Sequence, residues 1–188
     1  MAIRSLAASH DWTVADLHAL PDDGNRYEIL DGVLCVTPSP RYVHQRAVVT
    51  LFELLQPYAR ALDYTVMPLS GDLQYSDRTL VVPDAFVYRD PPDARVRDWS
   101  GVHPVQLVVE VLSRSTRIRD RTVKRALYQL QGIPEYWIID TDARVIERWR
   151  PDSTAAECLV QSLSWQPVSF WAPLEIDVAA YFAAVLDA

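Results

Sequence analysis

The stretch VQLVVEVL, residues 105–112, is almost continuously apolar, with one acidic residue, Glu110, inside it. Such a run is typical of a strand buried on both faces of a sheet. The segment from Glu135 to Asp140 has the same character. Between the two, helical spacing extends from about Asp120 to Gln131, and a glycine and a proline follow. A buried strand, a helix and a second buried strand predict an α/β fold with a mixed central sheet flanked by helices.

Further elements are expected on both sides of this unit, within a single domain over residues 1–188. The Asp31–Gly32 pair is a strong signal for a tight hairpin near the N-terminus. The C-terminal part should add a second hairpin and a closing helix. The expected elements are a hairpin at 26–30 and 33–36, a helix at 42–62 that Pro57 kinks or shortens, strands at 64–69, 72–75, 80–88 and 145–149, and a helix at 178–186.

The composition is that of a globular protein, with 49% hydrophobic and 23% charged residues. No apolar run approaches the length of a membrane span, and the first ten residues lack the apolar core of a signal peptide. Cys35 and Cys158 form no metal-type cluster. We therefore expect a cytoplasmic protein with two free thiols.

Charge is distributed unevenly along the chain. The formal net charge of −7 argues against a nucleic-acid partner, but residues 114–125 hold six basic residues and one acid. This basic segment indicates either a phosphate-binding surface or an ordinary solvated helix face. Of the 18 basic residues only one, Lys124, is a lysine, and it lies in this segment.

Two acidic residues stand in apolar strand patterns, where an unpaired carboxylate is costly. Asp84 follows Pro83 in VVPDAFVY and shares a face with Phe86, and Glu110 shares a face with Val108. Pro83 indicates an edge strand or a bulge. Each acid could form a buried salt bridge or cap a strand end. On adjacent strands about 4.8 Å apart, the two could instead hold one hard cation, Mg²⁺ or Mn²⁺.

The lysine has two interpretations of its own. Periodicity predicts that Val123, Ala126, Leu127 and Leu130 form the buried stripe of their helix, with Lys124 at its edge. From there Lys124 could reach over the sheet towards the two acids. The spacing favours the alternative, in which Lys124 pairs in solvent with Asp120, one turn earlier.

A series of motifs runs through most of the chain in order. It comprises RYEILDG (26–32), SP followed by His44, VVPD (81–84), LVVEVLSRST (107–116), Asp120-x-x-x-Lys124-x-x-x-Tyr128 and GIPEYWIID (132–140). This series resembles the PD-(D/E)XK nuclease superfamily and, within it, the Uma-type restriction endonuclease family. One residue departs from the superfamily pattern. Its lysine usually lies two residues after the glutamate, where this chain has Leu112, and in the Uma-type pattern Lys124 of the following helix replaces it.

The resemblance implies a restriction-endonuclease-like core with an extra N-terminal hairpin and a C-terminal hairpin plus helix. It implies a DNA endonuclease in which Asp84 and Glu110, with the Val111 carbonyl, bind Mg²⁺ or Mn²⁺. Lys124 would orient water or stabilise charge on phosphorus. Glu28 and His44 are weaker site candidates, with an arginine pair and a helix cap as their simpler roles. Phosphate contacts are expected from Arg114, Arg117 and Arg121.

Three functions remain open at this point. The leading one is a homodimeric metal-dependent endonuclease, since double-strand cleavage needs two sites. The main alternative is a catalytically silent protein with this fold that acts in nucleic-acid binding or assembly. The third is a phosphodiesterase acting on small nucleotides. The C-terminal aromatics Trp149, Trp165, Phe170 and Trp171 are either a dimer interface or part of the core.

Overall fold

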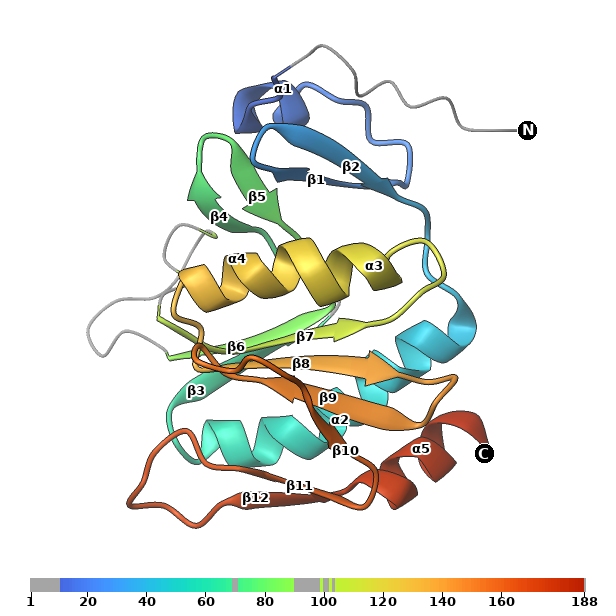
Figure 1. Ribbon diagram of the computed structural model, residues 1–188, viewed down its shortest axis with the longest axis vertical. Helices are drawn as coiled ribbons and strands as arrows, with labels where there is room; N and C mark the ends of the chain where they lie inside the picture. The colour runs from blue at the N-terminus through green and yellow to red at the C-terminus, as the bar shows by residue number, and fades with distance from the viewer. Residues whose placement is uncertain (1–10, 69–70, 90–98, 100–101, 103, 188) are drawn as a thin grey trace. The chain divides into compact units, whose positions relative to one another are not determined.

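The computed structural model of the protein describes residues 11–68, 71–89, 99, 102 and 104–187 (Figure 1). These residues form two compact units, each of which is described by itself. The first contains the described residues of 1–39 and 72–82, and the second those of 40–71 and 83–188.

The first unit is a four-stranded antiparallel sheet with one short helix. Its strands are β1 (Arg26–Leu30), β2 (Val33–Thr37), β4 (Leu73–Ser76) and β5 (Thr79–Val81), in the order β2-β1-β5-β4. The β1–β2 hairpin turns at Asp31 and Gly32, whose φ angles are 49° and 79°, as a tight two-residue turn requires. Helix α1 (Val14–His18) begins with a Thr13–Asp16 capping box and packs Val14 against Leu80 and Val82. The predicted N-terminal hairpin is therefore confirmed.

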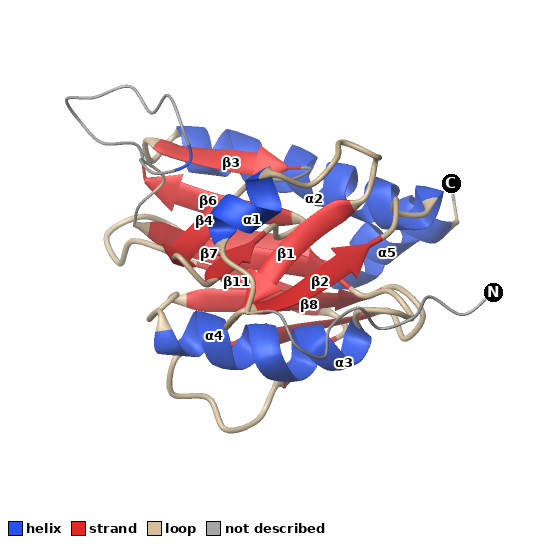
Figure 2. Cartoon of the chain, turned by 90° about the horizontal axis from the view of Figure 1, so that it is seen from above, coloured by secondary structure: helices blue, strands red, loops and turns tan. Residues whose placement is uncertain are grey.

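The second unit is built on a six-stranded mixed sheet. Its strands are β3 (Tyr64–Pro68), β6 (Ala85–Arg89), β7 (Val105–Val111), β8 (Glu135–Asp140), β9 (Val145–Trp149) and β10 (Glu157–Leu159), in the order β10-β9-β8-β7-β6-β3. Figure 2 shows β3, β6, β7 and β8 following one another across it. Strands β7 and β8 are parallel because a helical crossover joins them, as the sequence predicted.

The segment 80–88, predicted as one strand, is divided between two sheets. Strand β5 ends at Val81 and β6 begins at Ala85, with Pro83 and Asp84 in the connection. Proline has no N–H for a strand ladder, which accounts for the break. Strand β6 is not an edge strand, since it pairs with both β3 and β7, but its register with β7 shifts between Val87 and Tyr88, as a bulge would produce.

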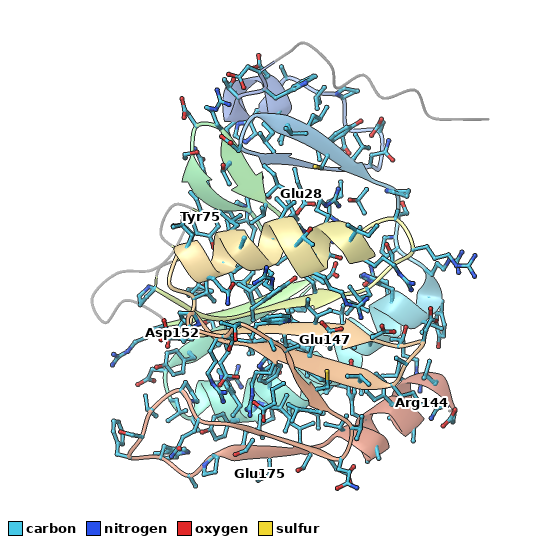
Figure 3. All side chains as sticks on the ribbon, viewed as in Figure 1. Glu28, Tyr75, Arg144, Glu147, Asp152 and Glu175 are labelled. Carbon is cyan, nitrogen blue, oxygen red and sulfur yellow. The ribbon has the colours of Figure 1, made fainter. Side chains whose placement is uncertain are left out.

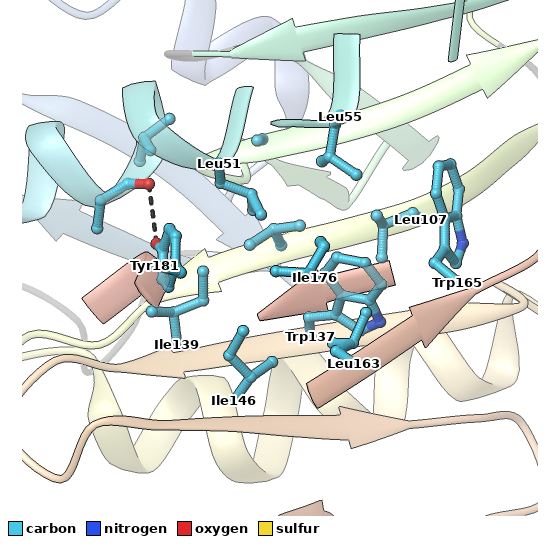
Figure 4. Packing of buried hydrophobic residues seen from close by; sticks show 14 of the residues in the cluster. Leu51, Leu55, Leu107, Trp137, Ile139, Ile146, Leu163, Trp165, Ile176 and Tyr181 are labelled. Carbon is cyan, nitrogen blue, oxygen red and sulfur yellow. Dashed lines mark hydrogen bonds between the residues drawn. The ribbon is translucent and has the colours of Figure 1, made fainter. Parts of the chain in front are cut away.

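The main core fills one face of the six-stranded sheet (Figure 4). Helices α2 (Tyr42–Arg60) and α5 (Val178–Leu186) and the hairpin of β11 (Ser162–Trp165) and β12 (Leu174–Asp177) pack there. Trp165 is buried in this core, whereas Phe170 is exposed. The Tyr181 hydroxyl donates to the Ala47 carbonyl at 2.9 Å and links the two helices. Pro57 does not shorten α2, because it lies in the last turn and the helix continues to Arg60.

A continuous helical segment covers the opposite face of this sheet (Figure 1). It consists of α3 (Arg117–Arg119), a π-helical turn η2 (Asp120–Lys124) and α4 (Arg125–Leu130). The predicted apolar stripe is wrong here. Val123 and Leu130 are 50% and 81% exposed, whereas Asp120, Lys124 and Tyr128 are buried. The side of this helix that faces the sheet is therefore polar.

Two expectations from composition concern the chain as a whole. Among the described residues, no helix has the length and apolar character needed to cross a membrane. Cys35 and Cys158 are both free thiols, as predicted.

Candidate active site

Glu110 and Lys124 form a buried ion pair. The Lys124 Nζ donates to Glu110 Oε1 at 2.7 Å, and each side chain is 3% exposed. The Tyr128 hydroxyl donates to the same oxygen at 3.2 Å. The expectation that Lys124 pairs with Asp120 in solvent is therefore wrong. Lys124 lies on the sheet side of its helix and reaches the glutamate of the central strand.

The π turn explains why the buried polar residues stay on one side of the helix. Thr116, Asp120, Lys124 and Tyr128 are spaced by four residues, and all are buried. In a regular α-helix each step of four residues advances about 40° around the axis, so the row would drift by about 120°. A π turn has more residues per turn and reverses part of that drift. The irregularity at η2 thus keeps Asp120, Lys124 and Tyr128 over the sheet.

Asp84 is held by two donors at the start of β6. Its Oδ2 accepts a hydrogen bond from the Val111 backbone N–H at 2.8 Å and lies 3.0 Å from His44 Nε2. Because Val111 follows Glu110 directly, this bond holds Asp84 next to the part of β7 that carries Glu110. His44 contacts Asp84 and does not cap α2. Its other ring nitrogen, Nδ1, is buried without a hydrogen bond.

Asp120 is a third buried acid, 1% exposed, and neither carboxylate oxygen has a hydrogen-bond partner of normal geometry. Burial raises the pKa of the Asp120 carboxyl. The Lys124 ammonium, the Thr116 hydroxyl and the Arg119 guanidinium act against this rise, and the charge of Asp84 adds to it. These influences place Asp120 in the same electrostatic environment as Asp84 and Lys124.

Tyr136, on β8, contacts the helical segment that carries Asp120. Its hydroxyl donates to the Asp120 carbonyl at 3.1 Å, and its ring packs on Tyr128 with centroids 4.8 Å apart. Burial raises the pKa of Tyr136 well above its usual value, and the charges of Glu110, Asp120 and Asp84 raise it further. The phenol therefore stays a neutral hydrogen-bond donor. Tyr136 is a core residue, as the sequence indicated.

Glu28 belongs to the first unit. It is 1% exposed, and its Oε1 accepts a hydrogen bond from the Val82 backbone N–H at 2.8 Å. Val82 lies two residues before Asp84 in the chain. Glu28 thus holds Val82 within the first unit.

The basic segment is partly neutralised by acids of β8, β9 and the turn between them. Arg121 donates to Glu147 and Asp140 at 2.8 Å, and Figure 3 labels Glu147 on β9. Arg117 lies 3.6 Å from Asp142 and is 42% exposed, and Arg114 is exposed. Because two carboxylates already hold Arg121, Arg114 and Arg117 are the better placed of the three for phosphate contacts.

The donor chemistry of the cluster suits a hard divalent cation. Carboxylate oxygens are the ligands that Mg²⁺ and Mn²⁺ prefer, and the buried Asp120 oxygens lack a donor. Among the described residues, no group of three or more His, Cys, Asp or Glu side chains is arranged to hold one ion directly. Mg²⁺ usually keeps several waters and needs only one or two protein carboxylates. The carboxylates of the cluster are therefore of the chemical kind that would suit such an ion, with water completing its coordination.

The fold matches that of a solved structure. A crystal structure of a putative nuclease belonging to DUF820, from Anabaena variabilis ATCC 29413, superposes on this chain with a TM-score of 0.69 at 19% sequence identity. The match covers 93% of this chain and 99% of the other. The expected α/β nuclease fold, with its mixed sheet between helices, is thus confirmed.

A family model also matches most of the chain. The Uma2 model, described as "Putative restriction endonuclease", matches residues 14–179. The chain therefore belongs to the Uma2 family, which confirms the resemblance seen in the sequence. No match was found among curated proteins.

Proposed function

We propose that this protein is a metal-dependent DNA endonuclease that hydrolyses phosphodiester bonds. The proposed catalytic site consists of Asp84, Glu110 and Lys124. Family and fold support a nuclease. The observation that carries the assignment of the site is the 2.7 Å contact between Lys124 Nζ and Glu110 Oε1. In the superfamily pattern, a lysine two residues after the glutamate lies in the site. In this chain, Lys124 reaches Glu110 from a helix instead.

Asp84 and Glu110, with the Val111 carbonyl, are the residues that would hold Mg²⁺ or Mn²⁺. When bound, such an ion polarises a phosphodiester and lowers the pKa of a water molecule. The chain's contribution is to fix the two carboxylates. The Val111 N–H and His44 hold Asp84, while Lys124 and Tyr128 hold Glu110.

Lys124 supplies a positive charge in a site from which water is largely excluded. There its ammonium would orient the attacking water or stabilise the negative charge that develops on the phosphoryl oxygens. Burial strengthens such interactions, because the local dielectric constant is lower than that of water. Tyr128 shares the same glutamate oxygen and positions Glu110.

DNA would bind through electrostatic contacts with its phosphates rather than through contacts with its bases. Arg114 and Arg117 are the proposed phosphate contacts. Cleavage of both strands needs two sites, so a homodimer is part of the proposal. Light scattering of the purified protein tests that part.

The direct test is cleavage of supercoiled plasmid in Mg²⁺ or Mn²⁺. Wild type should nick and linearise the plasmid, whereas Asp84→Ala and Lys124→Ala should lose activity while remaining folded by circular dichroism. The catalytic proposal is wrong if wild type cuts no better than these two variants.

Calorimetry separates the enzyme from a catalytically silent binding protein. Binding of Mg²⁺ or Mn²⁺ that disappears in Glu110→Ala supports the enzyme. DNA retention without metal, unchanged in Glu110→Ala, supports the binding protein. Parallel assays on dinucleotides and plasmid identify a phosphodiesterase for small nucleotides, which would cleave only the dinucleotides.

A further inference from the structure

Asp120 is a buried carboxylate that the proposed reaction does not yet use. It is 1% exposed, and neither of its oxygens accepts a hydrogen bond of normal geometry, although the Thr116 hydroxyl is close enough to lower the pKa of this carboxyl. Native proteins rarely leave a buried polar group in this state, because it has lost water without gaining a partner. An unsatisfied buried group of this kind often indicates a catalytic role or a bound water or ion.

The surroundings of Asp120 identify what it lacks. Lys124 and Arg119 stabilise its charge, while Asp84 destabilises it. The cluster holds three buried carboxylates, Asp84, Glu110 and Asp120, and its neighbouring cations are the buried Lys124 ammonium and the half-buried Arg119 guanidinium. When all of these groups are ionised an excess of negative charge remains, which a bound cation would counter.

Asp120 is also held firmly in place. Its backbone carbonyl accepts the Tyr136 hydroxyl at 3.1 Å, and its backbone N–H donates to the Thr116 carbonyl at 2.9 Å. It lies on the π turn that keeps the buried polar row over the sheet. The backbone that carries the carboxylate is therefore hydrogen-bonded on both of its polar groups.

Among the described residues, no three acidic or imidazole side chains are arranged around one ion position. We propose that Asp120 binds the cation of the site through water, by accepting hydrogen bonds from water molecules that the ion carries. This inference rests on the proposed function, which assigns direct binding to Asp84 and Glu110. Mg²⁺ retains such waters, and carboxylates outside the direct ligand set orient them.

The test measures Mn²⁺ binding by calorimetry, together with the melting temperature without metal. Wild type is compared with Asp120→Asn, Asp120→Ala, Glu110→Gln and the control Asp152→Asn, which makes the same chemical change at an exposed turn (Figure 3). We expect Asp120→Asn to weaken Mn²⁺ binding about tenfold or more. Its metal-free melting temperature should not fall, because the variant removes a buried charge. Asp152→Asn should behave like wild type.

Each outcome decides between the two proposals. If wild type binds Mn²⁺ and both Asp120 variants bind it equally well, the inference about Asp120 is wrong and the proposed nuclease site stands. If wild type binds no Mn²⁺, both are wrong. If neither Asp120 variant folds, the carboxylate has a structural role and the inference is again overturned.

Discussion

At the scale of single residues, the central feature is a lysine in an environment that excludes water. Lys124 and Glu110 are each 3% exposed and 2.7 Å apart. A buried ion pair gains Coulomb energy but loses hydration, so it is weak evidence for stability and is often retained for another reason. Arginine cannot replace this lysine well, because its planar guanidinium is larger and donates in a fixed fork.

The first prediction concerns the stability of this pair. Lys124→Met should lower the free energy of unfolding by about 3–5 kcal/mol, because it leaves the Glu110 charge buried without its ammonium. The double variant Lys124→Met/Glu110→Gln should recover much of that loss. Urea denaturation of the wild type, both single variants and the double variant measures the coupling. Additive effects would show that the two side chains do not interact.

At the scale of elements, the π turn and the contacts of Arg121, here called the arginine clamp, hold the helical segment that carries Lys124 on the sheet. The π turn aligns Asp120, Lys124 and Tyr128, and Arg121 joins the turn to β8 and β9 through Asp140 and Glu147. The hydrogen bond from Arg121 to Glu147 raises the pKa of the guanidinium. A group predicted to bind phosphate is therefore largely used for packing two elements together.

Deleting Thr122 tests the π turn. This residue is exposed, and its loss should convert η2 to regular α-helix, leave Asp120 and Lys124 three residues apart, and turn one relative to the other by about 30°. We expect a folded protein with little or no cleavage activity. Thr122→Ala, which keeps the chain length, should retain both fold and activity. Equal activity of the deletion and the substitution would contradict the proposed role of the turn.

The arginine clamp has a defined pH dependence. Burial tends to raise the pKa of Asp140, but the Ala143 N–H, Arg121 and the Asp142 N–H outweigh it and lower the pKa. The stabilisation from Asp140 is therefore present above its unfolded-state pKa of about 3.9 and is lost as pH falls through the folded value.

Arg121→Met should cost about 1–3 kcal/mol at neutral pH, a range that allows for the partial exposure of Arg121. As pH falls through the folded-state pKa of Asp140, the difference from wild type should shrink, because the Asp140 carboxylate becomes protonated in both proteins. Urea denaturation of wild type and Arg121→Met, from neutral pH into acid, measures this difference in the free energy of unfolding. A difference that stays constant or grows in acid would contradict the assignment.

The sequence predicted most elements because their signals are local. The hairpin at Asp31–Gly32, the buried strands β7 and β8 and the cap of α5 at Asp177 all follow from turn, periodicity and capping patterns. The helix after β7 was misread, because periodicity places apolar residues inside and here the buried row is polar. The four-residue spacing of Asp120, Lys124 and Tyr128 was visible, but its burial depends on tertiary contacts with Glu110 and Tyr136.

The candidate site was predictable only in part for a similar reason. Asp84 and Glu110 stood out as acids in apolar strands, and the structure buries both. His44 is a weaker site candidate in the sequence, and its contact with Asp84 could not be predicted because it joins residues 40 positions apart. Asp120 appears in a motif of the sequence and as a possible surface partner of Lys124, but no sequence pattern predicts that its carboxylate is buried.

At the scale of the whole molecule, a net charge of −7 must be reconciled with a polyanionic substrate. Binding to phosphates releases counterions, so each contact steepens the salt dependence of affinity. In a Glu110→Gln background that leaves DNA uncut, Arg114→Ala and Arg117→Ala should each reduce the salt slope by about one. Arg60→Ala, an exposed arginine at the end of α2, should leave it unchanged. Equal slopes in all variants would exclude these two arginines as phosphate contacts.

The central claim is that Lys124 acts on the Glu110 site from a helix, and cleavage of supercoiled plasmid in Mn²⁺ by Lys124→Arg tests it most directly. The account predicts that wild type and Asp152→Asn nick the plasmid, while Lys124→Arg is nearly as inactive as Lys124→Ala although its charge is kept. Cleavage by folded Lys124→Arg at the wild-type rate would contradict the claim.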